Sequence, residues 1–234
     1  MQPEVTRREA LVGGAAGLAA FSLTGAVAHG AVSSQDAKPA TAPSGYVARD
    51  FSGLVGTPGF SRTLLENHFT LYQGYVKNTN AAATALAEAA KAGTASAPAA
   101  AEIRRRFGWE FNGMRLHELY FENLGGKDAP AKDGKAAKAI AASFGSVEAW
   151  DKEFRAVGGM RGIGWVALAL DPWSNRLFNT WINEHDVGVL AACPIVLIMD
   201  VFEHAYMTDY GIKKADYIEA FMRSINWPNV EKRI

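Results

Sequence analysis

The apolar residues of this chain change their periodicity once, and this change limits the possible folds more than any other feature. From Ser61 to about Ala90 they recur at the spacing of one helix face, and a second helical segment runs from about Ala99 to Leu124. Glycine and proline interrupt the pattern between the two segments, and Ser61 is a suitable N-cap. We therefore predict a helical hairpin over residues 60–125.

The second half of the chain, residues 126–234, combines two kinds of segment. Some have helical spacing, and others are apolar, β-branched and aromatic runs separated by turn signals. The helical segments are 136–144, 147–157 and 214–225, and the β-type segments are 163–170, 176–182 and 187–198. The sequence predicts an α+β fold, with an N-terminal helical hairpin and a C-terminal lobe in which helices flank a three-stranded antiparallel sheet.

The first 28 residues have the composition of an export signal. Thr6-Arg7-Arg8 precedes a Gly/Ala-rich apolar run that closes with Ala26-Val27-Ala28. This pattern predicts a twin-arginine signal peptide over 1–28, cleaved after Ala28, and an exported, periplasmic protein with no stable membrane association after cleavage. The alternative is an uncleaved membrane anchor, which the four glycines of the apolar run disfavour. Residues 29–59 are rich in Ser, Ala, Pro and Gly, and we expect a flexible linker there.

Composition excludes several classes of site. Lys+Arg and Asp+Glu both total 24, so the chain is formally neutral and we expect no nucleic-acid partner. The single cysteine, Cys193, rules out an intrachain disulfide framework and a cysteine-rich zinc module. Chemistry that needs imidazole must draw on only five histidines.

Asp200 and His204 form the densest local pattern that can bind a metal. They are four residues apart, directly after an apolar run, and can converge on one ion. His68 and His117 lie one on each arm of the predicted hairpin, so antiparallel packing can bring them to the same level. Three imidazoles and one carboxylate suit iron or manganese. From spacing alone, ordinary core or surface roles for these histidines stay open.

Residues 200–206, Asp-Val-Phe-Glu-His-Ala-Tyr, closely resemble the Asp-x-Trp-Glu-His-Ala-Tyr signature of the iron/manganese superoxide dismutase family. Several other segments match the family in the same order, and the resemblance covers about residues 60 to 230. They are Phe111-Asn-Gly113, His117-Glu-Leu-Tyr-Phe121, Gly162-Ile-Gly-Trp165, Ala191-Ala-Cys-Pro194 and Ile225-Asn-Trp227.

This resemblance implies a site and a reaction. Superoxide is the expected substrate, with one iron or manganese ion per subunit and a bound water or hydroxide as fifth ligand. Tyr75 matches the family's substrate-gateway tyrosine, and Trp165 matches an aromatic residue that lines the pocket. Glu203 matches a residue that reaches a metal-binding histidine across a dimer interface, so a homodimer is expected. The four implied metal ligands are His68, His117, Asp200 and His204.

The spacing of the first histidine departs from the family pattern. His68 precedes Tyr75 by seven residues instead of eight. In a regular helix a spacing of seven keeps both side chains on one face, with Tyr72 between them at i+4. We therefore keep His68 as a ligand and place Tyr72 near the family's second gateway position, with plain aromatic packing as its alternative.

The family's outer-sphere glutamine is also missing. One of its two usual positions holds Gly113, and the other, within Ile195–Ile198, offers no amide. His185, in the turn Glu184-His185-Asp186, is the best substitute hydrogen-bond donor to the metal-bound solvent. The alternative is an exposed turn histidine without a role in the site.

The predicted function is dismutation of superoxide to dioxygen and hydrogen peroxide by a mononuclear iron or manganese centre. One alternative is an exported metal-binding homologue with weak or no dismutase activity. Another is a mononuclear iron oxygenase with two histidines and one carboxylate. The sequence disfavours the oxygenase, because no Arg or Lys cluster lies near the ligands to bind an acidic cosubstrate. Iron and manganese stay equally open.

Overall fold

The computed structural model describes residues 45–127 and 129–234. The predicted signal peptide, 1–28, and the first part of the predicted linker lie outside the described residues. In the described part, no helix combines the length and the apolar composition needed to cross a bilayer. The elements are η1 (Ser52–Leu54), α1 (Arg62–Lys91), α2 (Pro98–Asn123), α3 (Lys135–Phe144), α4 (Val147–Gly158), β1 (Gly164–Asp171), β2 (Arg176–Asn183), β3 (Ile195–Asp200), η2 (Glu203–Ala205), α5 (Met207–Tyr210), α6 (Lys214–Arg223) and α7 (Trp227–Glu231).

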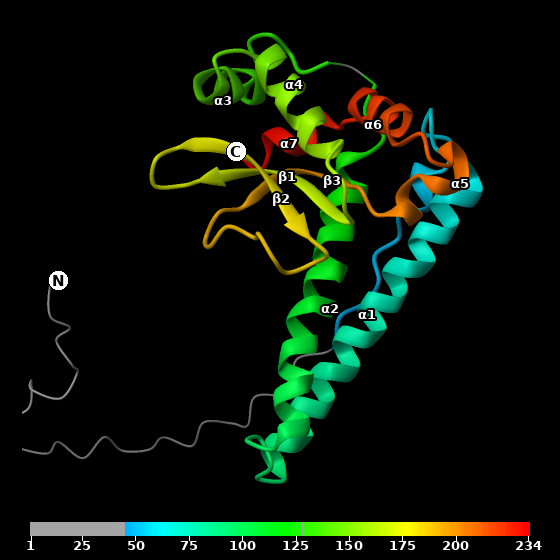
Figure 1. Cartoon of the computed structure of the whole chain (residues 1–234), viewed down its shortest axis with the longest axis vertical. Helices are drawn as coiled ribbons and strands as arrows, with labels where there is room; N and C mark the ends of the chain where they lie inside the picture. Colours follow the sequence, from blue (N-terminus) through cyan, green and yellow to red (C-terminus); the bar gives the residue numbers. More distant parts are fainter. Residues whose placement is uncertain (1–44, 128) are drawn as a thin grey trace, which may run out of the picture. The chain divides into compact units, whose positions relative to one another are not determined.

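Helices α1 and α2 form the predicted hairpin; in Figure 1 they lie close together at the connecting end and diverge toward the end that carries the sheet. The Ser61 hydroxyl accepts a hydrogen bond of 3.1 Å from the Leu64 amide, which confirms Ser61 as the N-cap. Pro98 opens α2, where its fixed φ suits the first helical turn. Because α1 continues without a break from His68 to Tyr75, residues seven apart share one face.

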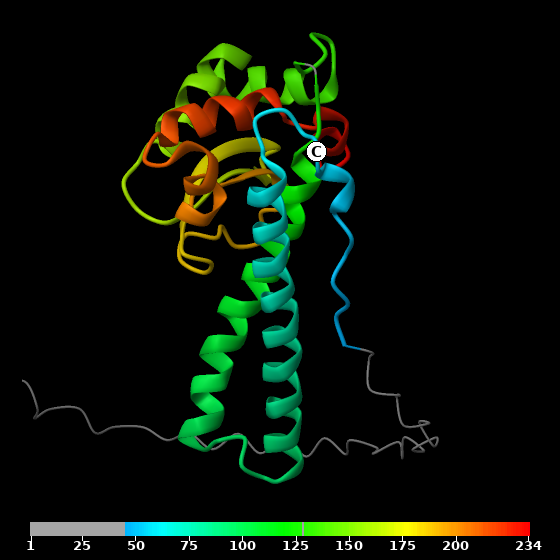
Figure 2. The ribbon, with the colours of Figure 1, turned by 90° about the vertical axis from the view of Figure 1, so that its right-hand side faces the viewer.

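Residues 45–59 run alongside the hairpin before α1 begins (Figure 2), and we call them the strap. The Tyr46 amide donates to the Asn80 side chain and the Tyr46 carbonyl accepts from it, both at 2.8 Å. Farther along, Arg49 pairs with Glu122, which also pairs with Arg233 near the C-terminus. These contacts differ from the flexible linker expected over 29–59, because side-chain bonds to the backbone hold the strap.

The sheet has three antiparallel strands in the order β2-β1-β3. The central strand, β1, is buried at every residue from Gly164 to Leu170. Its register places Trp165 directly opposite Asp200 of β3. The third strand begins at Ile195, later than predicted, because Gly188 and Ala192 adopt positive φ values of 104° and 57° and interrupt the extended run. The predicted α+β class is confirmed.

Two hydrogen bonds fix the end of β3 against the helices. The Asn123 side-chain oxygen, at the end of α2, accepts from the Ile198 amide at 2.9 Å. The Tyr217 hydroxyl of α6 donates to the Asp200 carbonyl at 2.6 Å. Figure 1 shows the sheet and the remaining helices gathered at one end of the long hairpin. The end of β3 is therefore held at fixed positions relative to α2 and α6.

Candidate metal centre

Four side chains from four different elements converge between the hairpin and β3. His68 comes from α1, His117 from α2, Asp200 from the end of β3 and His204 from η2. One possible ligand atom from each residue lies within 4.8 Å of those of the other three. His68, His117 and Asp200 are completely buried, whereas the His204 side chain is 25% exposed. The structure thus brings together all four residues that were predicted as ligands.

One carboxylate oxygen of Asp200 faces the three imidazoles. Its Oδ2 atom lies 3.2 Å from the Nε2 atoms of both His68 and His204, and 3.8 Å from Nε2 of His117. The other oxygen, Oδ1, accepts a 2.8 Å hydrogen bond from the Phe202 amide. This bond orients the carboxylate, so that Oδ2 is the atom available to a metal ion.

His117 fits a metal ligand on its own geometry. Its Nδ1 atom lies 2.5 Å from the Gly113 carbonyl, to which it can only donate. The Nε2 atom therefore carries a lone pair, and it is buried without a hydrogen-bond partner in the described chain. A buried unpaired acceptor is costly, and a bound ion would satisfy it. Three nitrogen donors and one carboxylate oxygen suit iron or manganese.

The environment gives the three fully buried residues the protonation states that metal binding needs, whereas the Asp200 carboxylate outweighs burial and raises the pKa of His204. Burial lowers the pKa of His68, and burial together with the nearby His68 lowers the pKa of His117 well below its ordinary value. Burial opposes ionisation of Asp200, but the imidazoles of His204 and His68 outweigh it and lower the pKa of this carboxyl. The cluster therefore favours a carboxylate and two neutral buried imidazoles.

Tyr75 and His185 form a hydrogen-bonded pair beside the cluster. The Tyr75 ring stacks on His117 with centroids 5.1 Å apart, and its hydroxyl lies 2.8 Å from His185 Nε2. The Trp165 indole donates to His185 Nδ1 at 3.1 Å. His185 is completely buried, so it is not the exposed turn residue of the alternative reading. Burial lowers the pKa of His185 to about 4 and raises the pKa of Tyr75 to about 12, so both are neutral near pH 7.

Gly113 explains how the Tyr75 ring can approach His117. A Cβ atom at residue 113 would lie 2.5 Å from Cδ1 of Tyr75, closer than non-bonded carbons pack. Any side chain there would displace the ring. Gly113, which stands where some members of the resembled family have glutamine, therefore leaves the space that the Tyr75 ring occupies.

Tyr72 forms no hydrogen bond with Tyr75 or His185, and its hydroxyl bonds to other described residues. Tyr72 is fully buried, and its hydroxyl donates to Glu118 at 2.9 Å and accepts from the Arg49 amide at 2.9 Å. Its ring packs against Phe51 of the strap. These contacts fit the packing alternative, because the hydroxyl joins the strap to both long helices. The gateway role of Tyr72 stays a prediction.

Trp109 also lies beside the Tyr75–His185 pair, and none of the sequence motifs above includes it. Its ring lies 4.5 Å from His185 and 5.5 Å from Tyr75, measured between centroids. Its indole donates to Glu184 at 3.2 Å. A usable signal was present, because Trp109, Gly113 and His117 are spaced four apart on α2 and so share one face.

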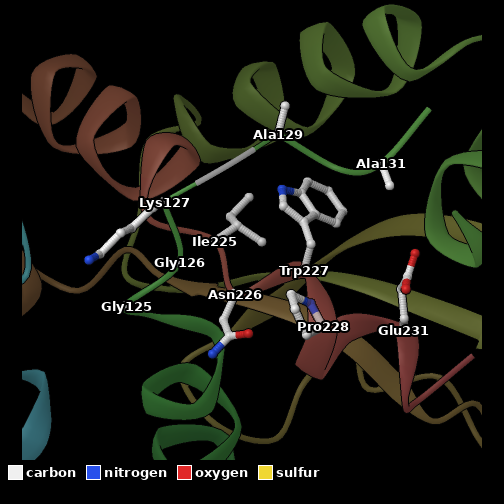
Figure 3. Close-up of a pocket in the computed structure, with 10 residues that line it drawn as sticks. All are labelled: Gly125, Gly126, Lys127, Ala129, Ala131, Ile225, Asn226, Trp227, Pro228 and Glu231. Atoms are coloured by element: carbon white, nitrogen blue, oxygen red, sulfur yellow. The ribbon is translucent and has the colours of Figure 1, made fainter.

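The cavity in Figure 3 lies away from this centre. Its lining comes from the connection that follows α2 and from the segment that enters and forms α7. The Trp227 indole stands in the middle of this lining. None of the four clustered ligand residues lines it, so this cavity has no part in the site described above.

Fold and site together define a class: an α+β protein with a buried cluster of three histidines and one aspartate that could hold one metal ion. Comparison with known proteins narrows this class. Residues 132–233 match the model of the iron/manganese superoxide dismutases, C-terminal domain.

Named relatives extend the similarity over most of the chain. A manganese superoxide dismutase of Haloferax volcanii is 38% identical over 166 residues, which are 71% of this chain and 82% of the relative. An iron superoxide dismutase of Cupriavidus metallidurans is 40% identical over 178 residues, 75% of this chain and 88% of the relative. A superoxide dismutase of Methanothermobacter thermautotrophicus, also named as an iron enzyme, is 36% identical over 180 residues, which are 75% of this chain and 87% of the relative. The chain belongs to the iron/manganese superoxide dismutase family.

Proposed function

We propose that this protein is a superoxide dismutase that uses one iron or manganese ion per subunit. The observation that carries the proposal is the convergence of four ligand atoms within 4.8 Å, including a buried Nε2 of His117 that has no other partner in the described chain. The names of the relatives support the same reaction, and they include both iron and manganese enzymes. The ligands we propose are His68, His117, Asp200 and His204.

When bound, the ion would supply one-electron redox chemistry, so that two superoxide anions and two protons give one dioxygen and one hydrogen peroxide. The chain's own residues hold and shield the site. Trp165 is completely buried beside His117, with ring centroids 4.9 Å apart, and helps to exclude water. Tyr75 and His185 place neutral hydrogen-bonding groups next to the ligands, where they can orient a small oxygen species.

The experiment that tests this proposal also tests the predicted export. The protein is isolated from the periplasm of its own host, its metal content is measured, and dismutation is assayed per bound ion. We expect close to one iron or manganese per chain, rapid dismutation, and a mature chain that starts at His29. A sample fully loaded with either metal but without activity would instead support the alternative, a metal-binding homologue.

We also propose a homodimer in which Glu203 contacts a metal-binding histidine of the partner. Glu203 is exposed, and its carboxylate forms no hydrogen bond or ion pair with the residues that the structure describes. It directly precedes His204, the partly exposed member of the cluster. An exposed carboxylate next to the partly exposed histidine of the cluster is well placed to bind across an interface.

Replacing Glu203 with alanine should therefore weaken the dimer at least about tenfold, because a charged hydrogen bond at its centre is lost. Sedimentation equilibrium of the metal-loaded protein measures the dissociation constant. Glu148→Ala, a change of another exposed glutamate on α4, is the matched control and should leave the constant unchanged. A wild-type protein that sediments as a monomer would overturn the dimer proposal.

A further inference from the structure

Both ring nitrogens of His185 are occupied by partners of different kinds. Nδ1 lies 3.1 Å from the indole nitrogen of Trp165, and Nε2 lies 2.8 Å from the hydroxyl of Tyr75. An indole N–H can only donate, so Nδ1 must accept and cannot carry a proton. A hydroxyl can donate or accept. The direction of the second bond is therefore decided by the first.

A neutral imidazole carries one proton, and here that proton must be on Nε2. His185 consequently donates to the Tyr75 oxygen. The two hydrogen bonds therefore run in one direction, from Trp165 to His185 and from His185 to Tyr75. The reverse direction would require an imidazole without any ring proton, which is an anion.

This series of hydrogen bonds leaves one donor free. The Tyr75 hydroxyl proton has no acceptor among the residues that the structure describes, whereas His185 has no second N–H to offer. The Tyr75 ring is stacked on His117, a member of the metal cluster, with centroids 5.1 Å apart. The unpaired proton is thus beside the site.

We propose that Trp165 is a positioning residue that fixes the tautomer of His185, so that Tyr75, and not His185, donates the hydrogen bond to an oxygen atom of a small molecule in the site. This changes the role expected from the sequence, in which His185 was the donor. The identity of the small molecule rests on the proposed dismutase function, but the tautomer of His185 does not.

The tautomer can be read directly by NMR on the full chain, freed of metal and labelled with ¹⁵N-histidine. Long-range ¹H–¹⁵N correlations distinguish protonated from unprotonated ring nitrogens, and the spectrum of His185→Gln, which lacks that residue's signals, assigns them. We expect the proton of His185 on Nε2. A proton on Nδ1, or an even mixture of tautomers, would overturn the proposal.

Trp165→Phe removes the indole N–H and keeps an aromatic ring in place. We expect His185 to lose its single tautomer and to populate both forms. The matched control is Trp150→Phe, which removes another buried indole N–H, the one that donates to Asn179 at 3.1 Å. In that variant the signals of His185 should stay unchanged. If Trp165→Phe leaves the Nε2 tautomer fully populated, Trp165 does not fix it.

The dismutase activity of the metal-loaded variants is an independent test of these hydrogen bonds. His185→Ala removes both hydrogen bonds of the series from Trp165 to Tyr75 and should lower dismutation per bound ion by about tenfold, with unchanged metal content. His185→Gln should recover part of that loss, because an amide oxygen can accept from Trp165 while the amide N–H donates to Tyr75. Wild-type rates in His185→Ala, or no recovery in His185→Gln, would contradict the proposal. An inactive wild type with the expected NMR result would refute only the dismutase function.

Discussion

Asp200→Asn is expected to lower the affinity for iron or manganese by more than about 100-fold, a larger effect than loss of an outer-shell partner. The Asp200 Oδ2 atom lies 3.2 Å from two of the three imidazoles and supplies the only negative charge among the four clustered residues. Asparagine keeps the size of the side chain but removes this charge, so the hard anionic ligand is lost. Metal titration of the purified variant measures the affinity, and dismutase activity should fall with occupancy.

The control for this variant is Asp171→Asn, which makes the same chemical change outside the cluster. Asp171 accepts hydrogen bonds from Trp173 and Ser174 in the turn after β1. This variant should bind metal like the wild type. If Asp200→Asn also bound metal with wild-type affinity, Asp200 would not be a ligand and the proposed site would be wrong.

Gly113→Ala is expected to lower the free energy of unfolding by about 1–3 kcal/mol, as overpacking of a core does. The added Cβ would lie 2.5 Å from the Tyr75 ring, a rigid group held between His117 and His185. In an open helical position the same change would instead stabilise the protein by about 1 kcal/mol, because alanine favours a helix over glycine. Denaturant unfolding of the metal-free chain measures the difference.

Gly108→Ala is the matched control, since it lies on the same helix and a Cβ there meets no atom within 4 Å. It should stabilise the protein slightly. In a Tyr75→Ala background the cost of Gly113→Ala should disappear, because the clashing ring is gone. A stabilising Gly113→Ala in the wild-type background would show that the packing described here is wrong. The same clash predicts that Gly113→Gln, which restores the family's amide, displaces Tyr75.

Much of the fold follows from local patterns in the sequence. The helical spacing from Ser61 onward predicted α1 and its cap, because one amphipathic face and one hydroxyl N-cap are local properties. The seven-residue spacing of His68 and Tyr75 likewise predicted that they share a face of a regular helix. The third strand was predicted too long, because apolar composition cannot reveal the positive φ of Ala192.

Other features depend on contacts between distant segments. The strap has little periodicity, and Asn80 and Tyr72 hold it through bonds to its backbone amides. Tyr72 and its partner Glu118 lie on different helices, so spacing within α1 could not show that its hydroxyl was already used.

The surroundings of His185 depend on tertiary contacts as well. The register of β1 against β3 places Trp165 opposite Asp200, and the indole of Trp165 then donates to His185. The sequence identified His185 as a candidate, but the direction of its hydrogen bonds requires the positions of all three partners. That direction is what moves the predicted donor from His185 to Tyr75.

The four proposed ligands are tested most directly by locating the metal in crystals of the wild-type protein, with anomalous X-ray scattering at the iron and manganese absorption edges. We expect one iron or manganese per chain, bound by Nε2 of His68, His117 and His204 and by Oδ2 of Asp200. Fully loaded, active protein in which the ion lies elsewhere and these four residues do not bind it would show that the proposed site is wrong.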